Sequence, residues 1–254
     1  MAADASPSDI EDFFQEASRH DVSLVTINRT HPEPVQELLA DAFSMQSVDL
    51  VERSLPKNGD DIVALRKDGQ VTAVSSLREL MGSFLLVNAD RFKTGTKGFD
   101  SDVPDVLKGM DETLFDLRGY PASNKEKLLL ILVSRHIERL AYEAGAGTLR
   151  STFQRLSRLE DELGTKKVYE RLAGRTVDVH VYGVPDGVPR GLDVTVHTGT
   201  SDEYRKSWCV VFEPPEGSGV ALIAHQQEPN RWRGFWTYDP ETVARANRYL
   251  ERSF

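Results

Sequence analysis

Apolar residues recur at helical spacing along several stretches of this chain, and the longest continuous apolar run lies near its middle. The positions that make up this pattern are Leu128–Val133, Ile137, Leu140 and Ala141. Ser123 with Glu126 forms the pattern of a capping box, and Gly145 suits the left-handed position just after a helix. A helix that is apolar nearly all round must be covered on several sides. We therefore predict a central buried helix over Ser123–Gly145, with Leu132 in the core.

Shorter helical patterns lie on both sides of the central helix. They extend over Ile10–Ala17, Pro34–Met45, two stretches within 155–174, Asp202–Lys206 and the segment after Asp239. Ser8 is expected to cap the first of them. Gly164 is expected to divide the pair within 155–174, with Thr165 as the cap of the second helix. Asp239 followed by Pro240 combines a favoured N-cap with a favoured first helical residue.

Alternating stretches rich in β-branched residues predict strands in both halves of the chain. Asp68 and Gly69, between two alternating runs, give the strongest hairpin signal, because a type I′ turn needs positive φ at both central residues. The other predicted strands are Ser23–Asn28, Thr148–Gln154, Val177–Gly183, Leu192–Thr198, Trp208–Glu213, Gly219–Gln226 and Arg231–Asp239. The pattern over Leu77–Val87 fits a helix or a strand, and the choice stays open.

Together these elements predict an α/β fold in which a mixed β-sheet is packed by the central buried helix, with a smaller α+β region at the N-terminal side. The stretch 91–105 is rich in glycine, charge and turn-forming residues, so we expect a loose boundary there. The predicted division is 1–98, an N-terminal α+β extension with a β-hairpin, and 99–254, an α/β domain.

Composition narrows the class of protein. A net charge of −9 and a pI near 5.2 argue against a general nucleic-acid binder, since such proteins carry a basic surplus. Arginine outnumbers lysine 21 to 10 beside 40 acidic residues, a bias that suits a protein from a halophilic source. The single cysteine excludes an internal disulfide, and neither a signal peptide nor a membrane-spanning run is visible. We therefore expect a soluble cytoplasmic protein.

Several motifs follow one another in the C-terminal part: LLLILVSRHIERLAYEAGAGTL, FQRLSRLEDELGTKKVYERLA, VDVHVYGVPD, SWCVVFEPP and RWRGFWTYDPETV. In this order they resemble the DICT sensory domain, most closely its haloarchaeal, largely stand-alone form. The resemblance covers roughly residues 100 to 254. It implies a sensory or interaction module of the kind found beside diguanylate cyclases and two-component kinases, with a connection to light responses.

The resemblance further implies a class of partner, but it assigns no chemical reaction to the domain. The expected partner is a signalling protein (a histidine kinase, a diguanylate cyclase or a regulator) or a small ligand, and a homodimer stays open. No GGDEF-type segment or kinase ATP-binding motif is visible in this chain. The family supplies no agreed catalytic residues that transfer to these positions. We therefore expect no catalytic residue, cofactor, metal, nucleic acid or membrane partner.

The strands Val177–Gly183 and Leu192–Thr198 contain the residues best suited to a site. Period two places Asp178, His180 and Tyr182 on one face of the first strand, and Asp193, Thr195 and His197 on one face of the second. If the strands are neighbours, histidines, carboxylates and a phenol gather on one surface that could bind a proton, a metal or an anionic ligand. The competing and favoured interpretation is an ordinary one-sided sheet, whose polar face alternates in the same way.

Aromatic residues in 231–239 offer a second candidate surface. Trp232, Gly234, Trp236 and Tyr238 share one face, which could stack a planar ligand or belong to the core, and the core is favoured. If the domain senses a ligand, we predict a pocket formed by His180, Tyr182, His197 and Trp236. Placing Trp236 there assumes a strand order that the pattern does not supply.

Two further sites are interpreted structurally. Arg135 and His136 follow the apolar run of the central helix, and a buried charge there needs a partner, for which Glu160 or Asp161 is proposed. Cys209 lies within an apolar strand and is expected to be an inert small hydrophobe.

Three functions remain after this reading. The leading one is a non-enzymatic sensory or adaptor protein in prokaryotic signal transduction. The second is a small hydrolase that acts on a phosphorylated or nucleotide substrate through the histidine and aspartate face. The third, a DNA-binding regulator, is disfavoured by the acidic balance and the lack of a recognisable helix-turn-helix.

Overall fold

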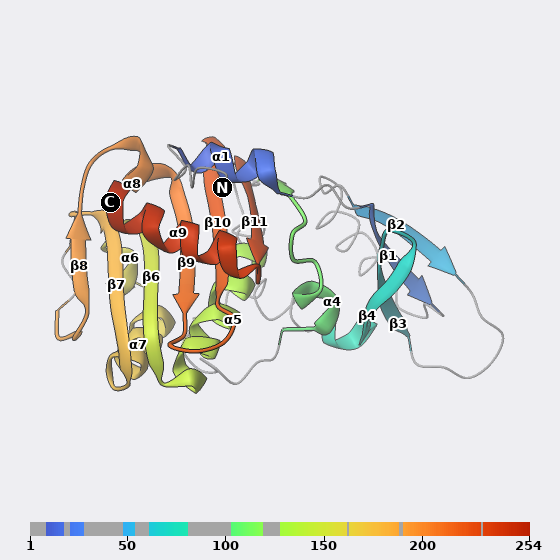
Figure 1. Ribbon diagram of the computed structural model, residues 1–254, viewed down its shortest axis with the longest axis horizontal. Coiled ribbons are helices and arrows are strands. Elements are labelled where there is room, and N and C mark those ends of the chain that lie inside the picture. Colours follow the sequence, from blue (N-terminus) through green and yellow to red (C-terminus); the bar gives the residue numbers. More distant parts are fainter. Residues whose placement is uncertain are drawn as a thin grey trace, which may run out of the picture.

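The computed structural model describes residues 9–17, 21–27, 48–53, 61–80, 103–118, 128–161, 163–187, 190–229 and 231–254. Strands in these residues form two sheets (Figure 1). The smaller sheet has the order β2-β1-β3-β4, with β1 Val22–Ile27, β2 Val48–Arg53, β3 Ile62–Lys67 and β4 Gln70–Ser76. In it β1, β3 and β4 are antiparallel, and β2 adds parallel to β1.

The larger sheet has seven strands in the order β5-β11-β10-β9-β6-β7-β8. Their bounds are β5 Phe115–Arg118, β6 Ala146–Arg155, β7 Thr176–Val184, β8 Thr195–Thr198, β9 Ser207–Glu213, β10 Val220–Glu228 and β11 Arg231–Thr237. Strands β6, β7 and β8 are parallel to one another, whereas the remaining neighbours are antiparallel. The mixed α/β fold predicted from the sequence is therefore confirmed.

Helices cover both faces of the seven-stranded sheet (Figure 1). Those in the described residues are α1 Ile10–Glu16, α4 Asp105–Lys108, α5 Leu128–Ala144, α6 Arg158–Asp161, α7 Leu163–Ala173, α8 Asp202–Lys206 and α9 Pro240–Ser253. Helix α5 packs with Val210, Leu222 and Trp236 on one face of the sheet. Helices α1 and α9 pack with the other face, through a second cluster that includes Cys209 and Ile223.

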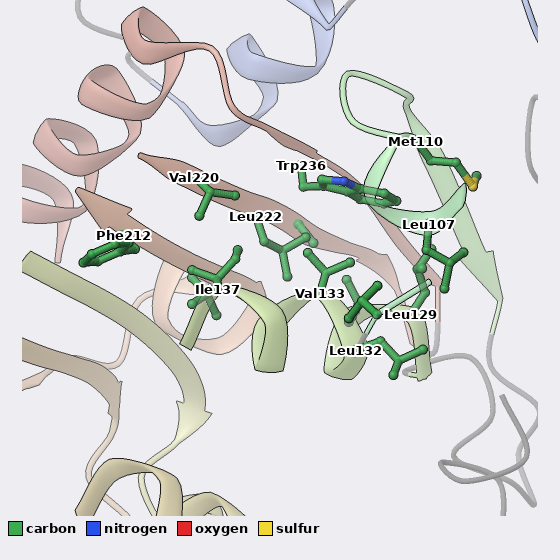
Figure 2. Close-up of a cluster of buried hydrophobic side chains, with 14 of the residues drawn as sticks. Leu107, Met110, Leu129, Leu132, Val133, Ile137, Phe212, Val220, Leu222 and Trp236 are labelled. Carbon is green, nitrogen blue, oxygen red and sulfur yellow. The ribbon is translucent and has the colours of Figure 1, made fainter. Parts of the chain in front are cut away.

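The central helix α5 lies against the middle of the sheet, as predicted. Leu130 and Ile137 are 0% exposed and Leu132 is 8% exposed, so the expected core position of Leu132 is confirmed. Figure 2 shows side chains of α5 meeting those of β9, β10 and β11. Gly145 adopts φ 69° and its N–H donates to the Ala141 carbonyl, as expected of the residue after a helix. The expected capping box at Ser123 lies outside the described residues.

The hairpin prediction is confirmed. Asp68 and Gly69 have φ of 50° and 84°, so both central residues of the turn between β3 and β4 are left-handed, as a type I′ turn requires. Asp68 also accepts a hydrogen bond from the Asp21 N–H just before β1. The turn therefore fixes the register of the β3–β4 hairpin, and the Asp68 side chain ties this hairpin to the start of β1.

Some predicted boundaries were wrong. The N-cap of α1 is Asp9, whose carboxylate accepts from the Glu11 N–H; Ser8 was predicted there and lies outside the described residues. Helix α7 begins at Leu163, so Gly164 does not divide two helices. Thr165 is the third residue of α7 and so is not its N-cap, and its hydroxyl accepts from the Arg135 guanidinium.

The remaining boundaries differ less. The strand predicted over Leu192–Thr198 is ordered as a strand only over Thr195–Thr198. Residues 77–80 are helical, which decides part of the open stretch. The helix predicted over Pro34–Met45 and the expected boundary near residue 98 lie outside the described residues. The final helix has the predicted cap, since the Asp239 carboxylate accepts from the Thr242 N–H.

The two sheets share a continuous apolar core. Helix α4 packs on β3 and β4, and the Val106 N–H donates to the Ser75 hydroxyl of β4. Residues of the small sheet, such as Leu65, belong to the same cluster as Met110 and Trp236. Helix α1 packs on the seven-stranded sheet instead (Figure 1). In the sequence, the strands of the small sheet thus lie between α1 and the segment that starts at α5, and both of these pack with the large sheet. No helix among the described residues is long and apolar enough to cross a membrane.

Candidate functional site

The predicted alternation along β7 is present in the structure. Val177, Val179 and Val181 are buried on one face, whereas Asp178 is exposed and His180 is half-buried on the other. Tyr182 shares the face of His180 but is 1% exposed, because α9 and its end cover that part of the sheet. Along this face of β7, side-chain exposure therefore decreases from the carboxylate of Asp178 to the phenol of Tyr182.

Strand β8 lies parallel to β7 and brings His197 beside this face. Tyr182 and His197 are register partners, and their rings stack at 4.4 Å with an angle of 12° between planes. The His180 Nδ1 lies 2.9 Å from the His197 Nε2, and the His180 Nε2 lies 3.0 Å from an Asp178 carboxylate oxygen. Three of the four predicted site residues thus form one connected cluster with Asp178, which we call the histidine pair cluster.

A buried arginine connects the cluster to the C-terminal helix. Arg150 of β6 is 7% exposed and donates to the Tyr182 hydroxyl at 2.7 Å. The same guanidinium donates to the Asn247 amide oxygen at 2.6 Å and to the Glu251 carboxylate at 3.3 Å, both on α9. A chain of contacts therefore extends from Asp178 on the surface, through both imidazoles and the phenol, to α9.

Burial and neighbouring charges shift the pKa values of two residues of the cluster, His197 and Tyr182. Burial lowers the pKa of His197 from its ordinary value of 6.5, and the charges of His180 and Arg150 lower it further. Burial raises the pKa of Tyr182, while Arg150 acts in the opposite direction. Tyr182 is therefore a neutral hydrogen-bonding group near neutral pH, and His197 favours its uncharged form.

Trp236 does not join this cluster, so the predicted four-residue pocket is wrong in that member. Register partners share a face of a sheet, and Val181, Ser151, Val210, Leu222 and Trp236 are connected by successive pairings. Trp236 therefore lies on the face of Val181, opposite that of Tyr182, and three strands separate β11 from β7. It is 2% exposed and packs against Phe115, which confirms the core interpretation of the aromatic strand.

The aromatic strand carries its polar residue on the opposite face. Arg233 forms two hydrogen bonds to the carboxylate of Asp116 on β5, at 3.0 and 3.4 Å. Trp232 and Trp236 are both in the core cluster of α5. This strand thus has a structural role, and its arginine joins β11 to the edge strand.

Arg135 has a structural partner, although not one of the two proposed. It pairs with Glu138 one turn along α5 and donates to the Thr165 hydroxyl. Glu160 accepts instead from Lys166 and from the Arg190 N–H, because the surface loop after β7 passes beside α6. Burial raises the pKa of Glu138, and the Arg135 guanidinium partly offsets that effect.

Cys209 is buried within its strand, as expected of a small apolar residue. It is 2% exposed, and burial raises its thiol pKa to about 12. Among the described residues no three histidine, cysteine or carboxylate side chains are arranged to hold a metal ion.

Sequence reasoning missed Arg150 and its α9 partners. Alternation along β6 places Arg150 on the face opposite Leu149 and Ser151, and it is the one charged residue of this strand before Arg155, which was a visible signal. The pattern could not show that Arg150 is the register partner of His180, because that pairing joins segments separated by two helices.

The comparisons with known proteins bear on this part of the chain. Residues 105–227 match the family model DICT, described as a sensory domain in diguanylate cyclases and two-component system. The matched segment begins at α4 and ends within β10, so it includes β6, β7 and β8 with the histidine pair cluster. It does not include β11 or α9, which supplies partners to Arg150.

No curated protein matches the chain. Among solved structures, it is similar to a polyphosphate kinase from Porphyromonas gingivalis, with 13% identity over 59% of this chain and a TM-score of 0.35. The similarity spans 25% of that kinase chain.

Proposed function

We propose that this protein is a non-enzymatic sensory or adaptor protein in prokaryotic signal transduction. The DICT match over residues 105–227 carries this proposal, because it implies a sensory role in signalling. DICT domains occur in diguanylate cyclases and two-component systems, so the proposed partner is a histidine kinase, a diguanylate cyclase or a regulator of such a system.

The signal is proposed to enter at the histidine pair cluster. His180, Tyr182 and His197 combine ring faces with polar atoms, the mixture that small-ligand sites use. The cluster lies at the edge of the sheet, with His180 half-buried and Asp178 exposed, so an incoming group can reach it. The contacts of Arg150 give the cluster a route to α9.

A thermal-shift screen tests this entry point. Nucleotides and chromophore-like planar compounds are screened on the wild type, on His180→Ala and on His225→Ala as the matched control. His225 is also a half-buried histidine beside a carboxylate, Glu11, but it lies on β10, away from the cluster. We expect a compound that stabilises the wild type and His225→Ala but not His180→Ala. A compound that stabilises all three proteins equally binds elsewhere, and the cluster is then not the site.

A second candidate function is a small hydrolase acting on a phosphorylated or nucleotide substrate. The observation in its favour is the carboxylate–imidazole pair of Asp178 and His180, since a carboxylate can orient a histidine for general-base catalysis. Hydrolysis of p-nitrophenyl phosphate and of nucleoside triphosphates by the wild type, abolished in His180→Ala, would support it. Equal rates in both proteins would contradict it.

The finer identity is also a proposal. The resemblance of the motifs and the excess of arginine and acidic residues support a haloarchaeal, stand-alone type that acts in the cytoplasm. Capture of partners from a native cytosol, read by mass spectrometry and compared between wild type and His180→Ala, identifies the signalling partner. Stability that does not rise with salt would argue against the halophilic origin.

A further inference from the structure

The histidine pair is surrounded by few charged groups, and they differ in sign. On β7, Asp178 contacts His180 and Tyr182 stacks on His197. Beyond the phenol lie Arg150 from β6, Glu251 from α9 and Tyr204 from α8, whose charges act on Tyr182. The exposed carboxylate therefore lies at the His180 end, and the buried guanidinium lies on the His197 side, where it disfavours a second positive charge.

Proton counting limits the states of the pair. Imidazole nitrogens bond to each other only if one donates and the other accepts. With Asp178 ionised, the His180 Nε2–H donates to the carboxylate, which leaves Nδ1 to complete the bond to the His197 Nε2. In the uncharged pair the His197 Nε2–H donates to the His180 Nδ1. After one proton is added, His180 carries both N–H groups and His197 becomes the acceptor.

A second proton cannot be accommodated in this arrangement. With both rings charged, the His180 Nδ1 and the His197 Nε2 each carry a hydrogen, so two donors face each other at 2.9 Å. The two positive charges also lie in neighbouring rings whose centroids are 5.2 Å apart. Both effects act against the same contact, and the bond between the rings has to break.

We propose that His180 and His197 form a proton-binding site that holds one proton as a shared unit and takes a second only by separating β8 from β7. This inference deepens the proposed function, on whose choice of site it rests, by naming the proton as a ligand of that site. The first proton is held between Asp178 and His197, so it leaves the strands joined. The second proton is the signal.

The position of β8 makes this separation structurally accessible. β8 has four residues, lies at the edge of the sheet, and pairs with β7 alone among the described strands. Its polar contact to β7 on this face is the bond between the two imidazoles, and His197 also covers the Tyr182 ring. When His197 withdraws, the Tyr182–Arg150 contact loses its cover, and the change reaches Asn247 and Glu251 on α9.

Nuclear magnetic resonance of the imidazole rings tests the shared proton. The whole chain is titrated from pH 8 to pH 4.5, with wild type, His180→Asn and His197→Asn used to assign the two rings. We expect two steps separated by about one pH unit or more, both rings responding to each step, as coupled groups do. In His197→Asn the coupling partner is gone, so a single step should replace the two. His225 is the internal control, because it has a carboxylate partner and, among the described residues, contacts no other histidine.

Hydrogen exchange tests the strand. Each exchange rate is divided by the intrinsic amide exchange rate at the same pH, because intrinsic exchange slows as the pH falls. The corrected rates of the Thr195–Thr198 amides should be at least about tenfold faster below the second step than above it, in proportion to the open population. The amides of β10 beside His225 should change less over the same pH range. Independent titration of the two rings at one pH, or no titration, would overturn the shared site. Two steps without faster exchange in β8 would overturn the separation.

These outcomes are distinguishable from failure of the proposed ligand site. A compound that needs His180, together with independently titrating rings, supports the proposed function and overturns the proton site. Coupled rings and a released β8, with no compound that needs His180, support the proton site and count against a small-ligand sensor.

Discussion

Truncation of Ile137 measures how much the central helix contributes to stability. Ile137 is 0% exposed and packs between α5 and the seven-stranded sheet (Figure 2), whereas Leu132, on the same helix, is 8% exposed. Both Ile→Ala and Leu→Ala remove three carbons, so transfer from water contributes about 2.4 kcal/mol in each case, at about 0.8 kcal/mol per methylene. Any difference between the two variants in the free energy of unfolding then reports how far neighbouring side chains move in to fill the cavity that each truncation leaves.

The expected costs follow from this difference. Ile137→Ala leaves a closed cavity between helix and sheet, so its cost should lie in the upper half of the range of about 2–5 kcal/mol. Leu132→Ala lies nearer the surface, where neighbours and water can fill part of the space, so about 2–3 kcal/mol is expected. The better helix propensity of alanine offsets less than about 0.7 kcal/mol in either variant. Glu143→Ala is the control, because its side chain is 60% exposed and, within the described residues, its ion pair is with Arg139 one turn away.

Urea denaturation followed by tryptophan fluorescence is the assay. The three tryptophans lie in β9 and β11, so their emission reports on the seven-stranded sheet that α5 covers. The midpoint should fall with an unchanged slope, and the control should change the free energy of unfolding by less than about 0.5 kcal/mol. An Ile137→Ala cost below about 1 kcal/mol, or below that of Leu132→Ala, would refute the reasoning that α5 is the centre of the core.

Four further predictions concern single positions. Gly147→Ala should destabilise more than Gly145→Ala in the same assay, because both have positive φ but only at Gly147 would a Cβ lie 2.5 Å from a backbone oxygen of β9; equal costs would contradict this. Cys209 should react with a thiol reagent only as fast as the protein unfolds, since burial raises its pKa to about 12, and a fast reaction in the native protein would contradict its burial. Arg150→Met should cost about 3 kcal/mol, the low end for a broken buried pair, because Glu251 is exposed and can be rehydrated; chemical denaturation with a near-zero cost would contradict its bridging role. Because the pKa of His197 is lowered in the folded protein, the unfolded chain binds more protons below about pH 6.5, so this contribution to stability is present above that pH and is lost as the pH falls. His197→Asn should therefore lose less stability between pH 7.5 and pH 5 than the wild type, and an identical loss would contradict the lowered pKa.

Local patterns predicted local features well. The turn at Asp68 and Gly69 and the cap at Asp239 depend on the chemistry of a few consecutive residues, so the sequence contained what was needed. The alternation that exposes His180 and buries Val181 also follows from the pleat of a single strand. These features agree with the structure because no distant segment can change them without breaking the element itself.

Strand order and long-range partners could not be predicted in the same way. Trp236 was assigned to the site with His180, but four successive strand pairings place it on the opposite face, and two of them (β6–β7 and β6–β9) join segments far apart in the sequence. Arg150, which connects the cluster to α9, was missed for the same reason. Such pairings depend on the fold as a whole, which alternation and spacing do not encode.

The docking of α1 imposes an order on events during synthesis. Phe13 and Phe14 of α1 pack on Tyr249 of α9 and Phe235 of β11, and Glu11 contacts His225 across 214 positions in the chain. At a translation rate of about 5–20 residues per second, that separation corresponds to roughly 10–40 s between the emergence of the two surfaces from the ribosome. During that interval the small sheet can fold, but the two phenylalanines have no native partner. The nascent chain therefore exposes the apolar side chains of this N-terminal segment, which can attract chaperones until β10, β11 and α9 have been made.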